Sequence, residues 1–139
     1  MKPTAMMLKS FAVDTNILIY LHDASSKKRT IAENILASNP KISTQVISEY
    51  LNTTRRLLTL GKADLMNQCA ELFKDCEIIP VTQPTLLLAA ALIKKYDFQL
   101  FDAVIAASAL ENNCSTLYSE DMQYSLIVND ILTIINPFI

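Results

Sequence analysis

Short apolar runs alternate along the chain with longer segments in which apolar residues recur every three or four positions. Because a buried strand gives a continuous apolar run and an amphipathic helix gives the longer spacing, the pattern predicts strands that alternate with helices. The predicted strands are 11–13, 41–43, 77–81, 115–118 and 131–135, and the predicted helices are 16–21, about 26–37, 45–60, 62–74, about 83–95 and 101–112.

Residues that begin or break helices support these boundaries. The Asn39–Pro40 pair marks a break, Thr44 is suited to cap the next helix, and Gly61 is suited to end it. Strands that alternate with helices are typical of a three-layer α/β/α fold with a central, mostly parallel sheet. No repeat or linker divides the sequence, so we expect one domain over residues 1–139.

The composition excludes several kinds of site. The 139 residues include one glycine, Gly61, and one histidine, His22. A Walker loop, a dinucleotide-binding turn and a G-x-S-x-G elbow each need several glycines, and an H-E-x-x-H zinc site needs two histidines. We expect His22 to be a surface residue without a functional role. Cys69, Cys76 and Cys114 form no C-x-x-C pair, so we expect buried free thiols rather than disulfides or a zinc site.

The charge and hydropathy of the chain restrict its partners. Twelve basic and 14 acidic residues give a formal charge of −2. Binding of nucleic acid would therefore require local basic patches or metal ions rather than bulk positive charge. The apolar run 86–93 is too short to span a bilayer, and the patch 6–8 is too short for a signal peptide. We expect a soluble, cytoplasmic protein with no membrane partner.

Two aspartates follow predicted strands. Asp14 comes after the first strand, and Asp121 follows the fourth strand in the sequence SED at 119–121. In open α/β sheets, ligands bind beyond the carboxyl ends of the strands, where both aspartates are expected. Each also has an ordinary alternative role, since Asp14 can cap a helix and the SED segment can form a turn. Glu120 could compete with Asp121 for any functional role.

Two further acids, Glu49 and Asp102, lie on predicted helices. Glu49 falls at the rim of an apolar helix face, so it either reaches solvent or extends into a cleft. Asp102 heads a stripe of apolar and small residues at helical spacing, and a charge there is unfavourable unless it is paired or binds a metal. Capping of the helix start is the alternative for Asp102. The stripe consists of Ile105, Ala106, Ala109 and Leu110.

Taken together, the four acids indicate a metal site. Side chains at strand ends and helix starts converge at one edge of a parallel sheet, and clustered carboxylates repel one another unless a cation lies between them. The divalent ions that prefer oxygen ligands, Mg²⁺ and Mn²⁺, suit such a cluster. An ion bound there can activate water and stabilise charge on a phosphodiester. This chemistry requires neither glycine nor histidine.

Four segments resemble the PIN-domain family of metal-dependent nucleases, which includes the VapC-type toxins of prokaryotic toxin–antitoxin pairs. The segments are VDTNILIY at 13–20, ISEYL at 47–51, FDAVIAASAL at 101–110 and SED at 119–121. They occur in the family's order and cover nearly the whole chain. The first and third are fairly specific to the family, whereas the second and fourth are weak alone.

This resemblance implies a sheet of about five parallel strands, Mg²⁺ or Mn²⁺ as cofactor, and RNA as substrate. It also implies a small antitoxin as partner and assembly as a homodimer. Asn16 would support the first acid, and Ser119 would help to order the site. The metal ligands and catalytic residues that the resemblance implies are Asp14, Glu49, Asp102 and Asp121.

Among the basic residues, helix geometry connects Arg56 to the predicted site. Arg56 lies two turns beyond Glu49 on a similar side of the helix, where it could contact an RNA phosphate beside the metal ions. A solvated helix face is the ordinary alternative. Binding through phosphates predicts an affinity that falls with salt.

The leading hypothesis is a Mg²⁺- or Mn²⁺-dependent endoribonuclease, the toxin of a type II toxin–antitoxin pair. The alternative is a non-catalytic PIN-like module that binds RNA or protein. Phosphoryl transfer on small molecules, as in haloacid-dehalogenase-like phosphatases, is disfavoured. Those enzymes need a second aspartate two residues after the first, and Asn16 occupies that position here.

Overall fold

The computed structural model describes residues 10–139, except for the side chain of Ser26. The strands are β1 Ser10–Val13, β2 Lys41–Ser43, β3 Glu77–Ile79, β4 Cys114–Tyr118, β5 Ile127–Val128 and β6 Leu132–Ile135. The helices are α2 Thr15–Ile19, the 3₁₀ helix η1 Tyr20–His22, α3 Ser26–Ala37, α4 Thr44–Leu57, α5 Lys62–Leu72, α6 Gln83–Tyr96 and α7 Leu100–Glu111.

The six strands form one sheet in the order β3-β2-β1-β4-β6-β5. Neighbouring strands are parallel except for β5, which is antiparallel to β6. The prediction of an α/β fold with a central, mostly parallel sheet is therefore confirmed. The sheet has six strands rather than about five, because the two-residue strand β5 is too short to give a recognisable pattern in the sequence.

The order of the strands reverses between β1 and β4. The chain leaves β1 through β2 to β3, and then returns to place β4 on the other side of β1. The last residue of β1, Val13, pairs in register with the last residue of β4, Tyr118. The residues that follow these two strands therefore emerge side by side, at the kind of reversal point where open α/β sheets bind ligands.

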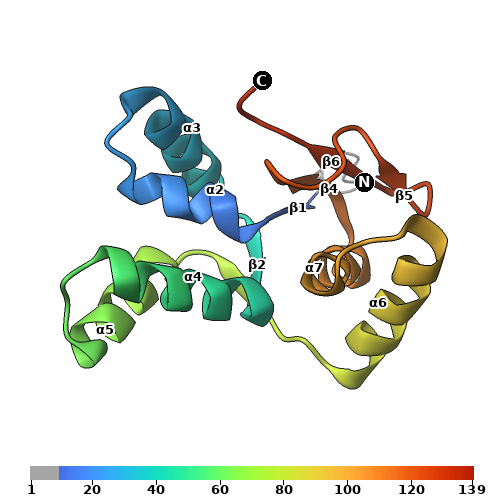
Figure 1. Ribbon diagram of the computed structural model, residues 1–139, viewed down its shortest axis with the longest axis horizontal. Coiled ribbons are helices and arrows are strands. Elements are labelled where there is room, and N and C mark those ends of the chain that lie inside the picture. Colours follow the sequence, from blue (N-terminus) through green and yellow to red (C-terminus); the bar gives the residue numbers. More distant parts are fainter. Residues whose placement is uncertain (1–9) are drawn as a thin grey trace, which may run out of the picture.

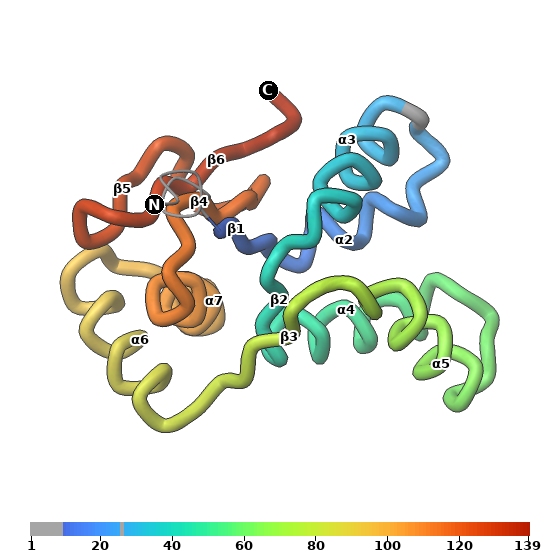
Figure 2. The backbone as a smooth tube through the Cα atoms, turned by 180° about the vertical axis from the view of Figure 1, so that it is seen from behind, coloured from blue at the N-terminus to red at the C-terminus, as the bar shows by residue number. Residues whose placement is uncertain are grey.

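The helices form two groups around this point. Figure 1 shows α6 and α7 together beside β4 and β6, whereas α2 to α5 extend away from β1 and β2. Figure 2 shows the same division from behind. Because α4 contacts both α2 and α7, the two groups meet where α2 leaves the end of β1.

Helix α7 is buried along most of its length. Every residue from Ala103 to Ala109 is buried, and the helix packs against α4, α6, β2, β4 and β6. Its many alanines suit this position, because small side chains let neighbouring elements approach closely. The first turn of α7, which contains Asp102, thereby lies near Gln45 and Glu49 in the first turns of α4.

Several boundaries differ from the predicted ones by a few residues, and two of them concern residues that the sequence suggested as helix ends. Ser43, rather than Thr44, caps α4, and its Oγ accepts a hydrogen bond from the Val46 backbone N–H at 3.1 Å. Helix α4 ends at Leu57, and Gly61 stands before α5 as its N-cap. With a φ of −66°, Gly61 does not adopt the left-handed conformation of a glycine that ends a helix.

The cysteines are free thiols, as the sequence predicts, with Cys69 and Cys114 buried and Cys76 half-buried. His22 differs from the expected surface residue. It is half-buried, its Nε2 lies 2.6 Å from the Tyr50 hydroxyl, and burial lowers its pKa. Within residues 10–139, no helix is long and apolar enough to cross a membrane.

Leu117, in the middle of β4, tests this account of the core. Its side chain is fully buried, so Leu117→Ala should leave a cavity and lower the free energy of unfolding by about 2–5 kcal/mol. Leu87→Ala on α6, where 67% of Leu87 is exposed, should change that free energy by less than about 0.5 kcal/mol. Urea titrations of both variants measure the difference, and equal losses would contradict the assignment of Leu117 to the core.

Candidate active site

The carboxylate of Asp14 lies directly after β1 and is 5% exposed. It caps α2, since its Oδ1 accepts a hydrogen bond from the Thr15 backbone N–H at 2.7 Å. Its Oδ2 accepts a second one from the Ser119 hydroxyl at 2.7 Å. Ser119 follows β4, so the pairing of β1 with β4 supplies this donor. The capping role that the sequence suggested is therefore real, and it coexists with a position in a larger acidic cluster.

That cluster lines a hollow of about 270 Å³ where α2, α4 and α7 meet. The four acids predicted from the sequence come from four separate parts of the chain, and the fold brings all of them to this hollow. The acids are Asp14, Glu49, Asp102 and Asp121, and the remaining lining residues are Thr15, Asn16, Ile19 and Thr53.

The acids influence one another electrostatically. The pKa of Asp14 is raised to about 6, against 3.8 for an ordinary aspartate, mainly by burial and to a smaller extent by the charges of Asp102 and Glu49. Hydrogen bonds from Ser119 and Thr15 lower the pKa of Asp14 in part. Burial, followed by the charges of Glu49 and Asp121, also raises the pKa of Asp102. The hollow therefore holds more negative charge than its surroundings neutralise, which favours the binding of a cation.

Asn16 and Ser119, predicted as supporting residues, both contact the acids. The Asn16 Nδ2 donates to Oδ2 of Asp121 at 3.0 Å, and its Oδ1 accepts a hydrogen bond from the Glu120 backbone N–H at 3.3 Å. Besides donating to Asp14, the Ser119 Oγ accepts a hydrogen bond from the Met122 backbone N–H at 3.2 Å. The loop after β4 is thus tied to the residues that follow β1.

Glu120 does not line the acidic hollow, because other side chains engage it. The Lys28 Nζ donates to its Oε2 at 2.8 Å, and the Tyr20 hydroxyl donates to its Oε1. Lys28 also lies over the rings of Tyr20 and Phe138, at 4.5 and 5.3 Å from their centroids. Of the two neighbouring acids in SED, the geometry therefore brings Asp121 to the hollow.

Sequence reasoning missed two partners of Glu49. The Thr15 hydroxyl donates to its Oε1 at 2.8 Å, and the Gln45 Nε2 donates to its Oε2 at 2.7 Å. Gln45 stands four residues before Glu49 on α4, a spacing that places two side chains next to each other on a helix. That spacing is a signal in the sequence, whereas nothing local connects Thr15 to a residue 34 positions away.

Arg56, the predicted phosphate contact, lies outside the lining of the acidic hollow. The residues of α4 that line the acidic hollow are Glu49 and Thr53. Arg56 is exposed one turn further along, and its Nε donates to the backbone oxygen of Asn52 at 3.4 Å. The role proposed for Arg56 in binding RNA stays a prediction.

The donor set fits a divalent cation in its chemistry, since four carboxylates supply oxygen ligands. Among residues 10–139, however, no three His, Cys, Asp or Glu side chains are arranged to hold a metal ion as they stand. Hydrogen bonds already occupy oxygens of Asp14, Glu49 and Asp121. Binding a cation would therefore require the side chains to close around it and exchange some of these bonds.

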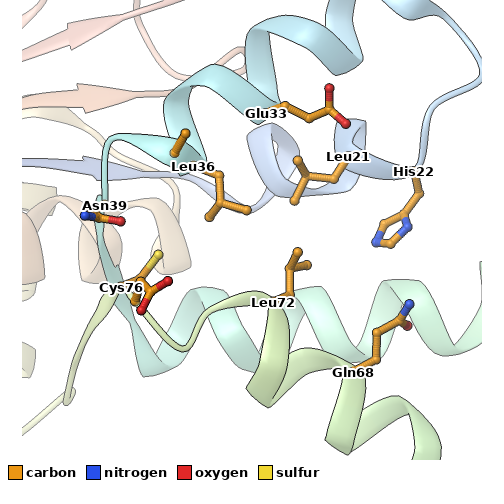
Figure 3. A pocket seen from close by; sticks show the side chains of 10 residues that line it. Leu21, His22, Glu33, Leu36, Asn39, Gln68, Leu72 and Cys76 are labelled. Carbon is orange, nitrogen blue, oxygen red and sulfur yellow. The ribbon is translucent and has the colours of Figure 1, made fainter.

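A larger cleft of about 540 Å³ lies elsewhere, between the η1–α3 segment and the α5–β3 segment. Figure 3 shows His22 at one end and Asn39 with Cys76 at the other, with Leu36 and Leu72 between them. The four predicted acids are absent from its lining, so this cleft does not form part of the candidate active site.

The sequence pattern of the PIN domain matches residues 11–127. Because the match extends over most of the chain, the protein belongs to the PIN-domain family, and the resemblance noted in the sequence is confirmed. No curated protein sequence matches the chain.

Solved structures from bacterial toxin–antitoxin systems share its fold. A toxin–antitoxin complex from Klebsiella pneumoniae aligns with a TM-score of 0.67 and 22% identity over 93% of this chain and 98% of that one. VapC20 of Mycobacterium tuberculosis, a sarcin–ricin-loop-cleaving toxin, aligns with a TM-score of 0.63 and 22% identity over 81% of this chain and 90% of that one. VapBC2 of Rickettsia felis, bound to a promoter DNA fragment, aligns with a TM-score of 0.64 and 20% identity over 89% of this chain and 97% of that one. At these identities the likeness establishes the fold alone.

The buried carboxylate of Asp14 predicts a pH-dependent stability of the metal-free protein. Its pKa is about 6 when folded and 3.8 in the ordinary state, so the folded protein binds the proton more tightly. Protonation of Asp14 therefore adds about 3 kcal/mol to the free energy of unfolding. This added stability is fully present below about pH 4 and is lost as the pH rises through 6. We expect Asp14→Asn to remove this loss in urea titrations in EDTA between about pH 4 and 7.

An acid outside the hollow provides the control for this titration. Asp64 lies in the first turn of α5 and is exposed, so Asp64→Asn should keep the pH dependence of the unaltered protein. If Asp14→Asn shows that same dependence, the carboxylate of Asp14 is not the group responsible.

Proposed function

We propose that the protein is a metal-dependent endoribonuclease that hydrolyses RNA phosphodiester bonds, and that it is the toxin of a type II toxin–antitoxin pair. The observation that carries this proposal is the gathering of Asp14, Glu49, Asp102 and Asp121 in one hollow beside the strand reversal. Membership of the PIN-domain family supports the same conclusion. A structural role alone would not require four carboxylates at one place.

In this proposal the four carboxylates hold Mg²⁺ or Mn²⁺. When bound, such an ion lowers the pKa of a coordinated water and stabilises negative charge on the phosphodiester. The protein supplies orientation. Ser119 fixes one oxygen of Asp14, Asn16 fixes one oxygen of Asp121, and Thr15 with Gln45 fixes Glu49. These neutral donors align the acids without cancelling the charge that attracts the cation.

The partners follow from the class of protein. VapC20 is a toxin that cleaves the sarcin–ricin loop, and VapBC2 is a toxin–antitoxin pair seen with promoter DNA. By analogy, we propose RNA as the substrate and a small antitoxin as the inhibitor of this chain. We also propose a cytoplasmic homodimer, as the resemblance to VapC-type toxins implies.

A non-catalytic binding module is the second candidate function. It is favoured by one observation: both carboxylate oxygens of Glu49 already accept hydrogen bonds, from Thr15 and from Gln45. If those bonds persist, Glu49 is a structural acid and the hollow lacks one ligand. Binding of RNA without cleavage in either Mg²⁺ or Mn²⁺ would support this alternative.

The nuclease proposal predicts cleavage of RNA in Mg²⁺ or Mn²⁺ that stops when EDTA is added. Asp102→Asn should reduce the cleavage rate by on the order of 10²-fold or more, because it removes a ligand charge from the hollow. Asp64→Asn should cleave like the unaltered protein. Gel analysis of the RNA products measures the rates, and circular dichroism checks that each variant is folded.

The same variants test the toxin proposal in cells. Induction of the unaltered protein and of Asp64→Asn in a bacterial host should arrest growth, whereas Asp102→Asn should not. Cleavage in vitro at the unaltered rate by folded Asp102→Asn would rule out the assigned site. Cleavage without growth arrest would retain the nuclease and remove the toxin assignment.

Asp121 and Glu120 make a matched pair for locating the fourth ligand. Asp121 lines the hollow, whereas Lys28 and Tyr20 engage Glu120. We expect Asp121→Asn to weaken Mn²⁺ binding at least about tenfold, and Glu120→Gln to change it by less than about threefold. Isothermal titration of the metal-free proteins with MnCl₂ measures both. The reverse order of effects would assign the ligand to Glu120.

A further inference from the structure

A second hollow, of about 510 Å³, adjoins the acidic one. The two share three carboxylates, those of Glu49, Asp102 and Asp121, so the space runs on from the candidate metal ligands toward the start of α7. The remaining lining residues of this second hollow are Gln45, Gln99, Leu100 and Phe101. Its lining therefore combines three carboxylates with two apolar side chains and two amides, of which Gln45 is hydrogen-bonded to Glu49.

Phe101 is exposed to an extent that the fold does not explain. Of its surface, 55% is accessible, as is 64% of the neighbouring Leu100, although the rest of α7 from Ala103 to Ala109 is buried. Other phenylalanines pair with aromatic rings, as Phe98 does with Tyr96 and Phe11 with Tyr118. Phe101 has no such partner among the residues that the structure describes. Its apolar surface is thus available at the edge of the candidate active site.

The charges around this surface restrict what can occupy it. The charged side chains that line the hollow are all acidic, so they repel a phosphate that is not neutralised by a cation. An uncharged planar group experiences no such repulsion and can stack on an aromatic ring. Gln45 and Gln99 add amide groups, which can both donate and accept hydrogen bonds at the edge of a base. Gln45 already donates one hydrogen bond to Glu49.

We propose that Phe101 is a stacking platform for an unpaired nucleobase of the RNA, next to the phosphodiester presented to the acids. Leu100 extends the apolar surface under the base, and Gln99 lies beside its edge. This inference rests on the proposed nuclease function, and it specifies single-stranded RNA, because the bases of a duplex are not free to stack on protein side chains.

A second copy of this chain is a less favoured occupant of the surface. Among the other exposed leucines, Leu86 and Leu87 lie in the first turns of α6. That end of α6 is next to the last turn of α7, since the Thr85 hydroxyl donates to Glu111. Leu86 and Leu87 are therefore at the opposite end of the helix pair from Phe101 and do not extend its apolar surface.

The absence of tryptophan from the sequence allows a direct test. Phe101→Trp introduces a single indole at the proposed platform, and Leu87→Trp introduces one on a comparably exposed part of α6. The probe is a short single-stranded RNA of mixed sequence, added with Ca²⁺ in place of Mg²⁺ to slow cleavage. We expect the RNA to quench the fluorescence of Phe101→Trp in a saturable way and to leave Leu87→Trp unchanged. The same RNA annealed to its complement should quench much less.

Removing the ring measures its contribution to binding. We expect Phe101→Ala to weaken the binding of single-stranded RNA about tenfold, Phe101→Tyr to restore it, and Phe101→Ala to bind Mn²⁺ like the unaltered protein. Equal RNA affinity in Phe101→Ala and the unaltered protein would overturn the inference while leaving the nuclease proposal intact. Loss of a dimer in Phe101→Ala with RNA affinity unchanged would assign the surface to a second copy. If the unaltered protein binds neither Mn²⁺ nor RNA, the proposed function fails together with this inference.

Discussion

The burial of a carboxylate at the end of the central strand β1 is the constraint on which the site depends. Asp14 loses hydration there, and a buried charge needs donors or a cation to compensate. Thr15 and Ser119 supply two donors, while Glu49 and Asp102 add negative charge. Because Ser119 follows β4, the donor depends on the placement of β4 next to β1. The topology of the sheet and the charge balance of the site therefore depend on the same pair of strands.

The neutral donors give the cluster its order without removing its charge. Serine, threonine, asparagine and glutamine side chains contact three of the four acids, and no lysine or arginine lines the hollow. Glu120, the neighbour of Asp121 in the sequence, is paired with Lys28 on α3 and does not line the hollow. A basic side chain in the hollow would compete with a divalent cation. Because Lys28 pairs with Glu120 outside the hollow, it leaves the proposed metal site free of such a competitor.

Sequence reasoning located the four acids because each stands in a local pattern. Asp14 and Asp121 follow apolar strands, and Asp102 heads a helical stripe, so periodicity marked them as candidates. The resemblance to the PIN-domain family then joined them with Glu49 into one predicted site. Local sequence could not decide whether Asp121 or Glu120 lies at the hollow. The placement of Glu120 depends on its ion pair with Lys28, 92 residues away. Thr15 was missed for the same reason, since its contact with Glu49 exists only after α4 packs against α2. Strand β5 was missed because two residues carry no periodicity.

The four acids differ in how freely they can move, because two of them lie on densely packed elements. A helix that is buried from Ala103 to Ala109 cannot shift without opening cavities, so Asp102 at its first turn stays in place, as does Asp14 at the end of β1. Asp121 is an exposed residue in the loop after β4, and Glu49 has the longer side chain of a half-buried helix residue. In the proposed metal site, Asp14 and Asp102 would therefore set a fixed position for an ion. Glu49 and Asp121 would adjust to its radius by exchanging the hydrogen bonds that now hold them, so selection between ions of different size would fall to these two acids.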